Sequence, residues 1–532
     1  MKNLFSFKRR QTLTATIGKL QIGSAHNIAS QSMTSRSTLD TDGCTDQIEK
    51  IEAAGGKLAR LTAIGKTEAL NLQNIKEKLA LNNSQIPLCA DIHFNAELAF
   101  IAAQIVDKVR VNPGNFAKKE DVETKLIKLI EICKTYKTAL RIGSNHGSLA
   151  PDIIEQYGDT PKGIVESALE FIRICHKNKF HNLVVSLKSS NPRIMVESYR
   201  LAAQQMELEG LRYPLHIGVT EAGEGIDGRI RSAVGIGALL SDGLGDTIRV
   251  SLTEPPENEI PVAETLINHF ANLTPQNYIP VNHENLPYNP LVFAKRQNAL
   301  KPIVVGENAD PTQGDFQTGS EDWFYVTLDD LTENTLETIA ENNTIPIVLS
   351  SENPYWVGEI RAAIVHLMRY NITNRIILYR NYNSENYPIL AAADMGAILI
   401  DGLAEGIWVD YNNSRTPANI ALSILQATRL RLSTTEIISC PSCGRTKYDI
   451  ATTVRNVKAR LSGYVGLKIA VMGCVVNGPG EMADADYGYI GCGEGLVALY
   501  KGRNVVERAV PEKDAIDKLE ALIINDIKSK ID

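Results

Sequence analysis

Residues 182–221 form the sequence NLVVSLKSSNPRIMVESYRLAAQQMELEGLRYPLHIGVTE, which contains a complete strand–helix–strand unit. The apolar runs at 182–188 and 215–221 predict two buried strands, and the amphipathic segment at 192–209 predicts a helix between them. A helix that connects two consecutive strands allows them to run parallel, so this unit is typical of a parallel α/β fold.

The same alternation of apolar run and amphipathic segment extends over the first half of the chain. Further strands are predicted at 28–33, 57–62, 86–92, 108–112, 139–144 and 247–252, and further helices at 44–54, 118–135, 161–178 and 260–270. Eight strand–helix units in about 240 residues match a (β/α)8 barrel, or TIM barrel, in number and in length. We therefore expect a TIM-barrel substrate domain at residues 1–271.

Polar side chains lie at or just after the C-terminal end of nearly every predicted strand. They are Gln31, Arg60, Asp91, His93, Arg110, Asn112, Arg141, Asn145, Lys188, Glu221, Arg249 and Ser251. In a TIM barrel these strand ends meet at one rim, where the active site lies. Each side chain alone is compatible with a salt bridge on the rim, but four arginines and a lysine together require a compensating anion. Because one guanidinium group can donate two parallel hydrogen bonds to the oxygens of a phosphate, we expect a phosphate or diphosphate ligand there.

The composition excludes several classes of protein. The 532-residue chain has a net charge of −7, which argues against a dedicated nucleic-acid binder and against a polybasic membrane anchor. No apolar stretch approaches the roughly 20 residues that a transmembrane helix needs, and the basic start of the chain lacks the apolar segment of a secretory signal. Eight cysteines are too few for a disulfide scaffold at this length. Cys44, Cys89, Cys133 and Cys175 are expected to be core residues, and the other four gather near the C-terminus.

The middle of the chain, residues 272–424, is predicted to form a separate α/β insert domain. Its apolar runs lie at 302–306, 323–328, 345–350, 375–380 and 397–400. The segment GALLSDGLGDTIRVSL (237–252) aligns without gaps with GAILIDGLAEGIWVDY (396–411), which pairs Arg249 with Trp408 and Ser251 with Asp410. Two explanations stay open: an incomplete duplication of the barrel that has lost its anion-binding residues, or a chance similarity. In both cases we expect the insert to act as a spacer.

The C-terminal segment, residues 425–532, is predicted to be a small α/β domain with a metal site. Cys440 and Cys443 form a C-x-x-C motif after one predicted strand, and Cys474 ends the next strand, so the three thiols can converge. Cys492 as fourth ligand would give four thiolates, which is typical of structural zinc or of an electron-transfer cluster. Glu481 would instead give an oxygen ligand that leaves readily, which suits a [4Fe–4S] cluster with one exchangeable iron. The spacing favours iron–sulfur, and both alternatives stay open.

Several motifs together resemble one enzyme family. SCPSCGR (439–445) and MGCVVNGPGE (472–481) are similar to the cluster domain of 4-hydroxy-3-methylbut-2-enyl diphosphate synthases, enzymes of the non-mevalonate isoprenoid pathway. The barrel agrees in QSMT (31–34), ADIHF (90–94), VRVNPGN (109–115), RIGSNHGSL (141–149), VESYRL (196–201), GVTEAGEGIDGR (218–229) and GDTIRVSLTEPP (245–256). The insert resembles the large three-domain form of plants and some bacteria.

This resemblance implies a cofactor, a substrate and a set of site residues. Cys440, Cys443, Cys474 and Glu481 would hold one [4Fe–4S] cluster, in a domain resembling the cluster domains of sulfite and nitrite reductases, and Cys492 would take no part. The substrate would be 2-C-methyl-D-erythritol 2,4-cyclodiphosphate, opened reductively with loss of water by two electrons from reduced ferredoxin or flavodoxin. Its diphosphate would contact Arg60, Arg110, Arg141, Lys188 and Arg249, and the rest of the pocket would comprise Asp91, Asn112, Asn145, His146, Glu221 and Ser251. Glu221 is the expected proton-handling residue, and a structural salt bridge with a rim arginine is the alternative that stays open. For His146 a hydrogen bond in the pocket is expected, with a role as proton donor as the alternative.

Rival functions and arrangements stay open at this point. One rival is a non-catalytic electron-transfer or zinc module fused to a phosphate-binding barrel, and another is a zinc-assisted aldolase or lyase that needs no reductant. The cluster domain would cap the barrel of a partner in a head-to-tail homodimer, as in the shorter form of the family, or the barrel of its own chain. Because no plastid transit peptide is present, a bacterial cytoplasm is the expected location.

Overall fold

The computed structural model describes residues 5–273, 301–475, 478–482 and 484–531. The chain divides into two compact units. One unit comprises Gln11–Arg229, Gly245–Glu264 and Thr434–Asp532, and the other comprises Met1–Arg10, Ile230–Leu244 and Thr265–Ser433. Within the described ranges, none of the helices combines the length and the apolar character that crossing a lipid bilayer requires. The predicted domain boundaries at residues 271 and 424 stay a prediction.

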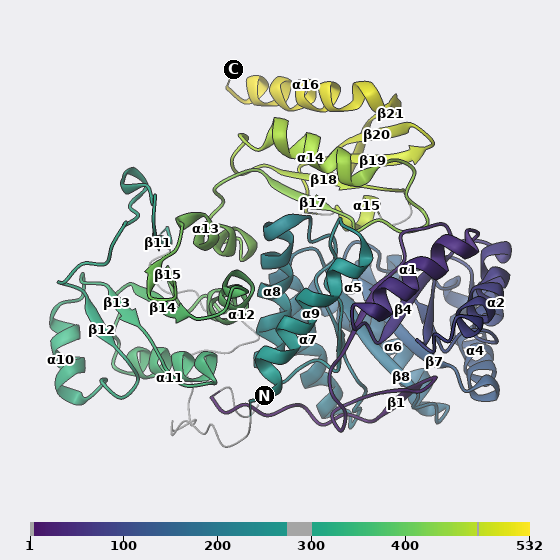
Figure 1. The fold of residues 1–532 in the computed structure, drawn as a ribbon, viewed down its shortest axis with the longest axis horizontal. Helices are drawn as coiled ribbons and strands as arrows, with labels where there is room; N and C mark the ends of the chain where they lie inside the picture. Colours follow the sequence, from purple (N-terminus) through teal and green to yellow (C-terminus); the bar gives the residue numbers. More distant parts are fainter. Residues whose placement is uncertain (1–4, 274–300, 476–477, 483, 532) are drawn as a thin grey trace. The chain divides into compact units, whose positions relative to one another are not determined.

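Eight parallel strands form a barrel in the first unit (Figure 1). They are β3 (Ala29–Met33), β4 (Leu58–Ala63), β5 (Leu88–Ile92), β6 (Lys108–Val111), β7 (Ala139–Asn145), β8 (Leu183–Lys188), β9 (His216–Ile217) and β10 (Thr247–Ile248). They pair in the order β8-β7-β6-β5-β4-β3-β10-β9. A parallel bridge between Val185 and Leu215 joins the two end strands and closes the ring. The predicted TIM barrel is therefore confirmed.

Helices follow the barrel strands, as the amphipathic segments predict. They are α1 (Thr41–Ala53), α2 (Lys66–Leu81), α3 (Ala96–Ala102), α4 (Val122–Tyr136), α5 (Pro151–Tyr157), α6 (Pro161–Lys177), α7 (Pro192–Leu208), α8 (Gly225–Ser241) and α9 (Glu259–Ala271). Capping side chains and prolines fix the N-terminal ends of several of these helices. Thr160 and Asn191 accept hydrogen bonds from the first free backbone N–H groups of α6 and α7, and a proline occupies the first turn of each helix.

A short N-terminal hairpin, not predicted from the sequence, closes the lower end of the barrel. It consists of β1 (Ala15–Ile17) and β2 (Leu20–Ile22). Its buried side chains pack with residues at or near the starts of the barrel strands in one core cluster, which comprises Ala15, Ile17, Ile22, Ala29, Leu58, Cys89, Ala139 and Val184. Strands of three residues are too short to give a periodic signal, so this plug escaped sequence-based recognition.

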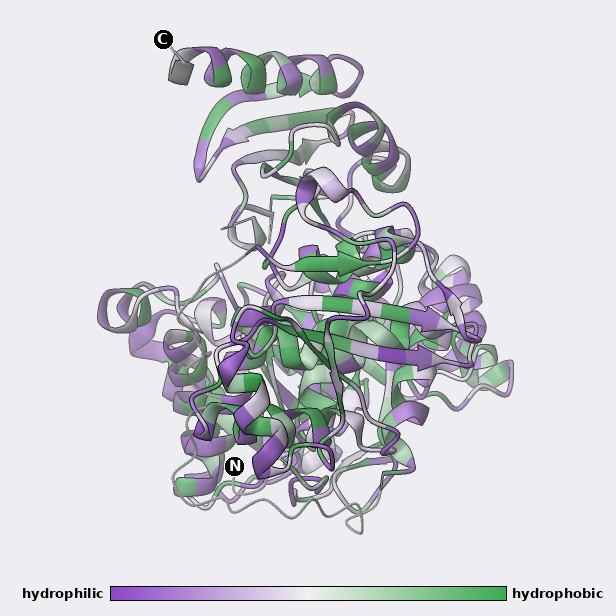
Figure 2. Cartoon of the chain, turned by 90° about the vertical axis from the view of Figure 1, so that its left-hand side faces the viewer, coloured by the Kyte–Doolittle hydropathy of each residue, from purple (hydrophilic) through white to green (hydrophobic). Residues whose placement is uncertain are grey.

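The cysteine-bearing domain is a five-stranded mixed sheet with helices. Its strands are β17 (Glu436–Ser439), β18 (Lys468–Met472), β19 (Tyr487–Gly493), β20 (Leu496–Lys501) and β21 (Asn504–Pro511), and its helices are α14 (Ile450–Leu461), α15 (Gly478–Glu481) and α16 (Glu512–Ile531). Hydrophobic and hydrophilic residues alternate along α16 (Figure 2). Its buried residues Ala515, Leu519 and Ile523 pack on the sheet, as expected for an amphipathic helix. The resemblance to sulfite and nitrite reductase domains stays a prediction.

The insert contains a parallel sheet in the order β11-β15-β14-β13-β12. Its strands are β11 (Ile303–Val305), β12 (Phe324–Val326), β13 (Ile347–Leu349), β14 (Ile376–Tyr382) and β15 (Gly406–Tyr411), with β16 (Ser414–Arg415) paired to β15. Its helices are α10 (Glu333–Glu341), α11 (Trp356–Arg369), α12 (Tyr387–Ile400) and α13 (Ala418–Ala427). The apolar run at 397–400 is the end of helix α12, whereas the other four runs contain strands of the sheet. A helix that is apolar on all sides cannot be distinguished from a buried strand by periodicity.

The two aligned segments occupy equivalent places in their sheets. Strand β10 lies between β9 and the first barrel strand β3, and strand β15 lies between β14 and the first insert strand β11. The alignment pairs Thr247 with Gly406, the residues at which the two strands begin. This shared position supports a duplication over a chance similarity. The insert lacks the cation of the barrel rim, because Trp408 stands in place of Arg249 and donates a hydrogen bond to Asp410 (2.9 Å).

Candidate active site

A pocket lies at the C-terminal ends of the barrel strands, under the cysteine-bearing domain. From the barrel it is lined by Met33, Arg60, Asp91, Arg110, Arg141, Asn145, Lys188, Thr220, Glu221, Arg249 and Ser251. From the other domain it is lined by Cys440, Pro441, Ser442, Cys443, Arg445, Met472, Gly473, Cys474 and Gly478. The structure therefore brings all five predicted rim cations and three predicted metal ligands into one cavity, although these two groups are far apart in the sequence.

The cysteine-bearing domain lies on the barrel of its own chain. Ala222, in the loop after β9, forms a parallel bridge with Ser439 at the end of β17. The Thr253 hydroxyl is 2.8 Å from the Ser439 hydroxyl and donates a hydrogen bond to the Cys440 carbonyl (3.1 Å). At another part of the rim, Asn191 donates to the Asp484 carboxylate (3.2 Å). The arrangement that the sequence left open is thus capping within one chain.

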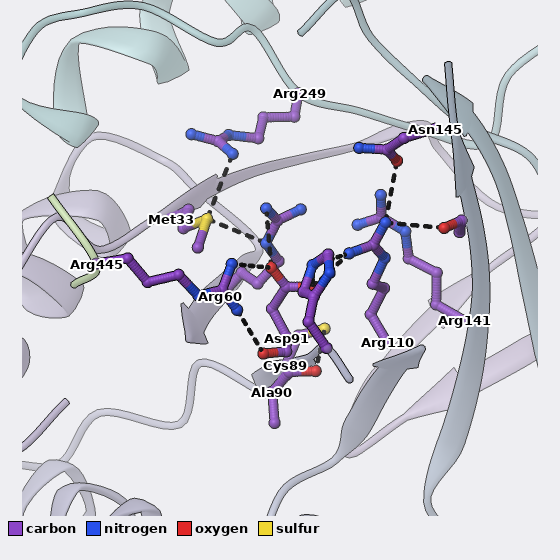
Figure 3. Close-up of polar contacts among 12 residues, drawn as sticks. Met33, Arg60, Cys89, Ala90, Asp91, Arg110, Arg141, Asn145, Arg249 and Arg445 are labelled. Atoms are coloured by element: carbon purple, nitrogen blue, oxygen red, sulfur yellow. Dashed lines mark hydrogen bonds and ion pairs between the residues drawn. The ribbon is translucent and has the colours of Figure 1, made fainter. Parts of the chain in front are cut away.

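Asp91 is the central counterion of the rim (Figure 3). Its carboxylate accepts a hydrogen bond from Arg110 (2.9 Å) and lies 3.5 Å from the Arg60 guanidinium. Burial alone would raise the pKa of Asp91, but the charges of Arg60 and Arg110 hold it well below its usual value. Arg249 has its own partner, because both oxygens of Glu259 accept from it at 3.0 Å. Two acidic side chains thus hold three of the rim arginines.

The other two rim cations, Arg141 and Lys188, have too little negative charge nearby to balance their own. Arg141 donates through Nε to the Ser186 hydroxyl (2.8 Å), and its Nη1 has no hydrogen-bond partner within the described residues. Burial, together with repulsion from Arg60 and Arg110, lowers the pKa of Arg141 to about 9. Burial and the charge of Arg141 also lower the pKa of Lys188 well below its ordinary value. A dianionic ligand would remove both penalties.

Glu221 lines the pocket in an unusual backbone conformation. It lies in the loop after β9 with φ of 50°, a left-handed region that non-glycine residues rarely adopt. The Glu221 residue is 8% exposed. Strained residues of this kind persist where the surrounding structure holds a functional group in place. The strain is therefore consistent with the proton-handling role expected of Glu221.

Two predicted pocket residues do not line this cavity. The Asn112 side chain accepts a hydrogen bond from the Gly114 amide (3.1 Å) and donates to the Ser148 hydroxyl (3.0 Å). His146 lies with its Nε2 3.7 Å from the Asp159 carboxylate. Both side chains therefore hold rim loops in shape, and their contact with a ligand stays a prediction.

Three cysteines face the cavity from the strand ends of the upper domain. Cys440 follows β17, Cys443 lies in the adjacent loop, and Cys474 follows β18. Burial raises the pKa of Cys440 and of Cys443, and the Gly473 amide donates a hydrogen bond to the Cys440 sulfur (3.3 Å). Thiols buried in this way become thiolates only beside a cation, and backbone N–H donors to sulfur are typical of iron–sulfur sites.

The fourth ligand position is described only in part. Glu481 ends α15, and its side chain lies outside the described residues. Cys492 is exposed on β19 and does not line the cavity. In the described part of the chain, no three His, Cys, Asp or Glu side chains are arranged to hold a single metal ion. In a cluster each thiolate binds its own iron, so three thiols that line one cavity are compatible with a cluster.

Sequence reasoning did not single out several pocket residues, among them Met33, Thr220 and Arg445. Met33 accepts hydrogen bonds through its sulfur from Arg60 (3.1 Å) and Arg249 (3.5 Å). Thr220 precedes Glu221 on the same loop. Arg445 reaches the barrel from the cysteine-bearing domain. Met33 and Arg445 lie inside quoted motifs, but their direction into the pocket depends on tertiary packing.

The fold and the site define a class of protein: a TIM barrel with a cationic mouth, covered by a cysteine-bearing domain of the same chain. Two protein-family models match the chain in these two parts. The GcpE TIM-barrel domain matches residues 12–264, and the GcpE protein C-terminal domain matches residues 436–525. The chain belongs to the GcpE family.

Curated relatives extend this similarity over nearly the whole chain. A protein of Phocaeicola vulgatus is 40% identical, with 98% of each chain covered, and one of Bacteroides thetaiotaomicron is 40% identical, with 99% of each covered. A protein of Porphyromonas gingivalis is 41% identical over 98% of each chain. All three are named 4-hydroxy-3-methylbut-2-en-1-yl diphosphate synthase (flavodoxin). The matches cover 98% or more of this chain, so the insert lies within the matched region.

Proposed function

We propose that this protein is a 4-hydroxy-3-methylbut-2-en-1-yl diphosphate synthase that reduces 2-C-methyl-D-erythritol 2,4-cyclodiphosphate. The observation that carries the proposal is the cavity in which under-compensated cations face three cysteines of the same chain. The names of relatives that match over almost the full length support it. In the overall reaction two electrons and one proton are taken up, one carbon–oxygen bond to the diphosphate opens, and one water leaves.

Cys440, Cys443 and Cys474 would hold a [4Fe–4S] cluster, with Glu481 as the fourth ligand. When bound, such a cluster supplies the two electrons one at a time at the mouth of the barrel. The three thiols line the same cavity as the rim cations, so a substrate held by the rim would lie next to the cluster. A carboxylate ligand such as Glu481 exchanges more readily than a thiolate.

The rim residues would bind and activate the diphosphate. Arg141 and Lys188 are buried without a full counterion, so they gain most from an approaching phosphate. Opening of the ring places additional negative charge on a phosphate oxygen, and fixed cations in a water-poor cavity stabilise that charge. Glu221, held in place by its loop, would deliver a proton to the departing oxygen.

Reduced flavodoxin or ferredoxin is the proposed electron donor. The relatives carry flavodoxin in their names, which supports flavodoxin as the first candidate. The expected bacterial cytoplasm and the homodimer stay predictions.

Anaerobic purification followed by iron, sulfide and zinc analysis tests the proposal. We expect iron and inorganic sulfide with a visible absorption band, and formation of the product only when a reductant is supplied. Zinc without sulfide, or activity without a reductant, would favour an aldolase or lyase. Glu481→Ala is expected to abolish turnover, whereas Cys492→Ser should leave cluster content and turnover unchanged. The reverse pattern would point to an electron-transfer or zinc module closed by four thiolates.

A further inference from the structure

Arg445 carries a cation from the cysteine-bearing domain into the mouth of the barrel. It lies two residues after Cys443, and its side chain is 5% exposed. Its guanidinium points toward Asp91 of strand β5 (Figure 3). The cavity around this buried guanidinium is lined by residues of both domains. It therefore forms only when the two domains are in contact.

The guanidinium of Arg445 has weak partners in this structure. Its contacts within the described residues are a 3.5 Å hydrogen bond to the Asp91 carbonyl and a 4.0 Å approach to the Asp91 carboxylate. That carboxylate is already engaged by Arg110 at 2.9 Å and lies 3.5 Å from Arg60. A guanidinium has five N–H donors, and burial with so few acceptors is costly. The one carboxylate near Arg445 within the described residues is thus shared with two other arginines, and Arg445 lines the same cavity as the rim cations.

The residue before Arg445, Gly444, lies in close contact with the rim of the barrel. A Cβ atom on Gly444 would lie 2.8 Å from the Arg36 carbonyl oxygen and 3.0 Å from the Thr62 hydroxyl. Only a residue without a side chain allows the cysteine loop to approach the barrel so closely. Arg445 is thus directed into the cavity by a backbone contact beside it.

We propose that Arg445 is a substrate-binding residue, which donates hydrogen bonds to the phosphate oxygens from the side of the cysteine-bearing domain. This inference rests on the proposed function and extends it. Five cations of the barrel hold the diphosphate from below, and Arg445 holds it from above. Because the cation travels with the cysteine loop, binding of the anion and seating of the cysteines over it are coupled.

Equilibrium binding without a reductant tests this role, because no turnover occurs. The probe is 2-C-methyl-D-erythritol 2,4-cyclodiphosphate, titrated by calorimetry into the anaerobic holoenzyme. Arg445→Ala is expected to weaken binding by about 10- to 100-fold, the usual range for a charge-assisted hydrogen bond. Arg445→Lys should recover part of the loss, because it keeps the charge but not the paired donors. Arg503→Ala is the matched control: Arg503 also joins the two domains, through Asp159 (3.1 Å), but its side chain is 62% exposed.

Hydrogen exchange at residues 440–446 provides a second readout. The ligand should slow exchange there in the wild type and in Arg503→Ala, but not in Arg445→Ala. A purely structural role of Arg445 would alter exchange with and without ligand by the same factor.

The outcomes separate the two proposals. A wild-type protein that does not bind the probe contradicts the proposed function itself. A wild type that binds it, together with an Arg445→Ala variant within about twofold of its affinity, overturns the role of Arg445 alone. If Arg445→Ala does not fold, the affinity of Arg445→Lys for the probe decides. Wild-type affinity in Arg445→Lys would overturn the role of Arg445, because lysine cannot form the paired hydrogen bonds.

Discussion

Gly147 and Gly480 face each other backbone to backbone, so that a Cβ atom on Gly147 would lie 1.9 Å from the Gly480 carbonyl oxygen. A Cβ atom on Gly480 would in turn lie 2.5 Å from the Gly147 carbonyl oxygen. Gly147 belongs to the rim loop after β7, and Gly480 belongs to the Gly-Pro-Gly turn of α15. The turn after Cys474 therefore serves to bring the cysteine-bearing domain into contact with the rim.

Replacing Gly147 by alanine is expected to separate the cysteines from the rim. The variant should lose most of its turnover while its iron content stays near that of the wild type, because the new methyl group cannot fit against the turn. Gly210→Ala is the control: Gly210 also has a positive φ, of 69°, but a Cβ atom there meets nothing within 4 Å. Both variants carry the backbone strain, of about 1 kcal/mol, and equal turnover in both would contradict this prediction.

Glu221→Gln is expected to lower kcat by about 100-fold or more and to change KM little. The amide keeps the shape of the side chain in the pocket but cannot deliver a proton. Steady-state kinetics with a chemical reductant measure both constants. Glu224→Gln changes a carboxylate on the same loop that does not line the cavity, so its kinetics should match the wild type. Unchanged kcat in Glu221→Gln would leave Glu221 as a counterion of the rim arginines.

Lys108→Met is expected to stabilise the barrel. Lys108 is fully buried on β6, and its Nζ atom has no hydrogen-bond partner within the described residues. Burial, with repulsion from Arg141 and Arg60, lowers its pKa to about 8. Removing this unpaired amine should gain about 1–3 kcal/mol, seen as a higher midpoint in calorimetric unfolding.

The matched control for this change is Lys76→Met. Lys76 donates to the Ile105 carbonyl (2.8 Å) and contacts Asp107 (3.2 Å), so its loss should lower the midpoint. A lower midpoint for Lys108→Met would reveal that the amine binds a buried anion.

His93 is expected to make the barrel sensitive to mild acid. Burial lowers its pKa to about 4, and the charge of Arg110 contributes to the same direction. In the unfolded chain its pKa is about 6.5. Between these values the unfolded chain binds a proton that the folded chain does not, so stability falls as the pH falls through this window. The loss amounts to about 3 kcal/mol at most.

Denaturant unfolding of the wild type and His93→Gln between pH 7.5 and about 4.5 measures this effect. The variant lacks the titrating ring, so its stability relative to the wild type should rise as the pH falls. A constant difference across the range would show that His93 titrates alike in both states.

Arg361→Met is expected to destabilise the unit that contains the insert. Arg361 is fully buried on α11 and donates to Asp242 (2.8 Å) and Asp401 (3.0 Å). These two aspartates are paired with each other in the alignment of the two related segments. Loss of the cation removes two buried ion pairs, at a cost of about 3–5 kcal/mol measured by chemical unfolding. Adding Asp242→Asn and Asp401→Asn should restore much of the loss, and no recovery would contradict the ion-pair explanation.

Strong local patterns made the barrel predictable from the sequence. Eight apolar runs gave its strands, and polar residues at their ends gave the rim cations, because side chains at the ends of parallel strands necessarily meet. The hairpin at Ala15–Ile22 was missed and the apolar end of α12 was not recognised as helical, since short or fully buried elements have no distinctive period. These failures lie where tertiary packing, rather than local pattern, decides the structure.

The site was predictable in part for the same reason. The convergence of Cys440, Cys443 and Cys474 follows from two adjacent strand ends. The place of Arg445 beside Asp91 depends on how two segments more than three hundred residues apart meet, and no local pattern records that meeting. Asn112 was expected in the pocket from its position after β6, but its side chain turns to its own loop.

A single polypeptide provides both the cations and the cysteines that line its cavity. A chain with a defect in the cations therefore cannot complement a chain with a defect in the cysteines. A mixed population of chains, some without the Arg141 side chain and some without the Cys440 thiol, contains no intact cavity. Co-expression of two such alleles should therefore leave a cell as deficient as either allele alone.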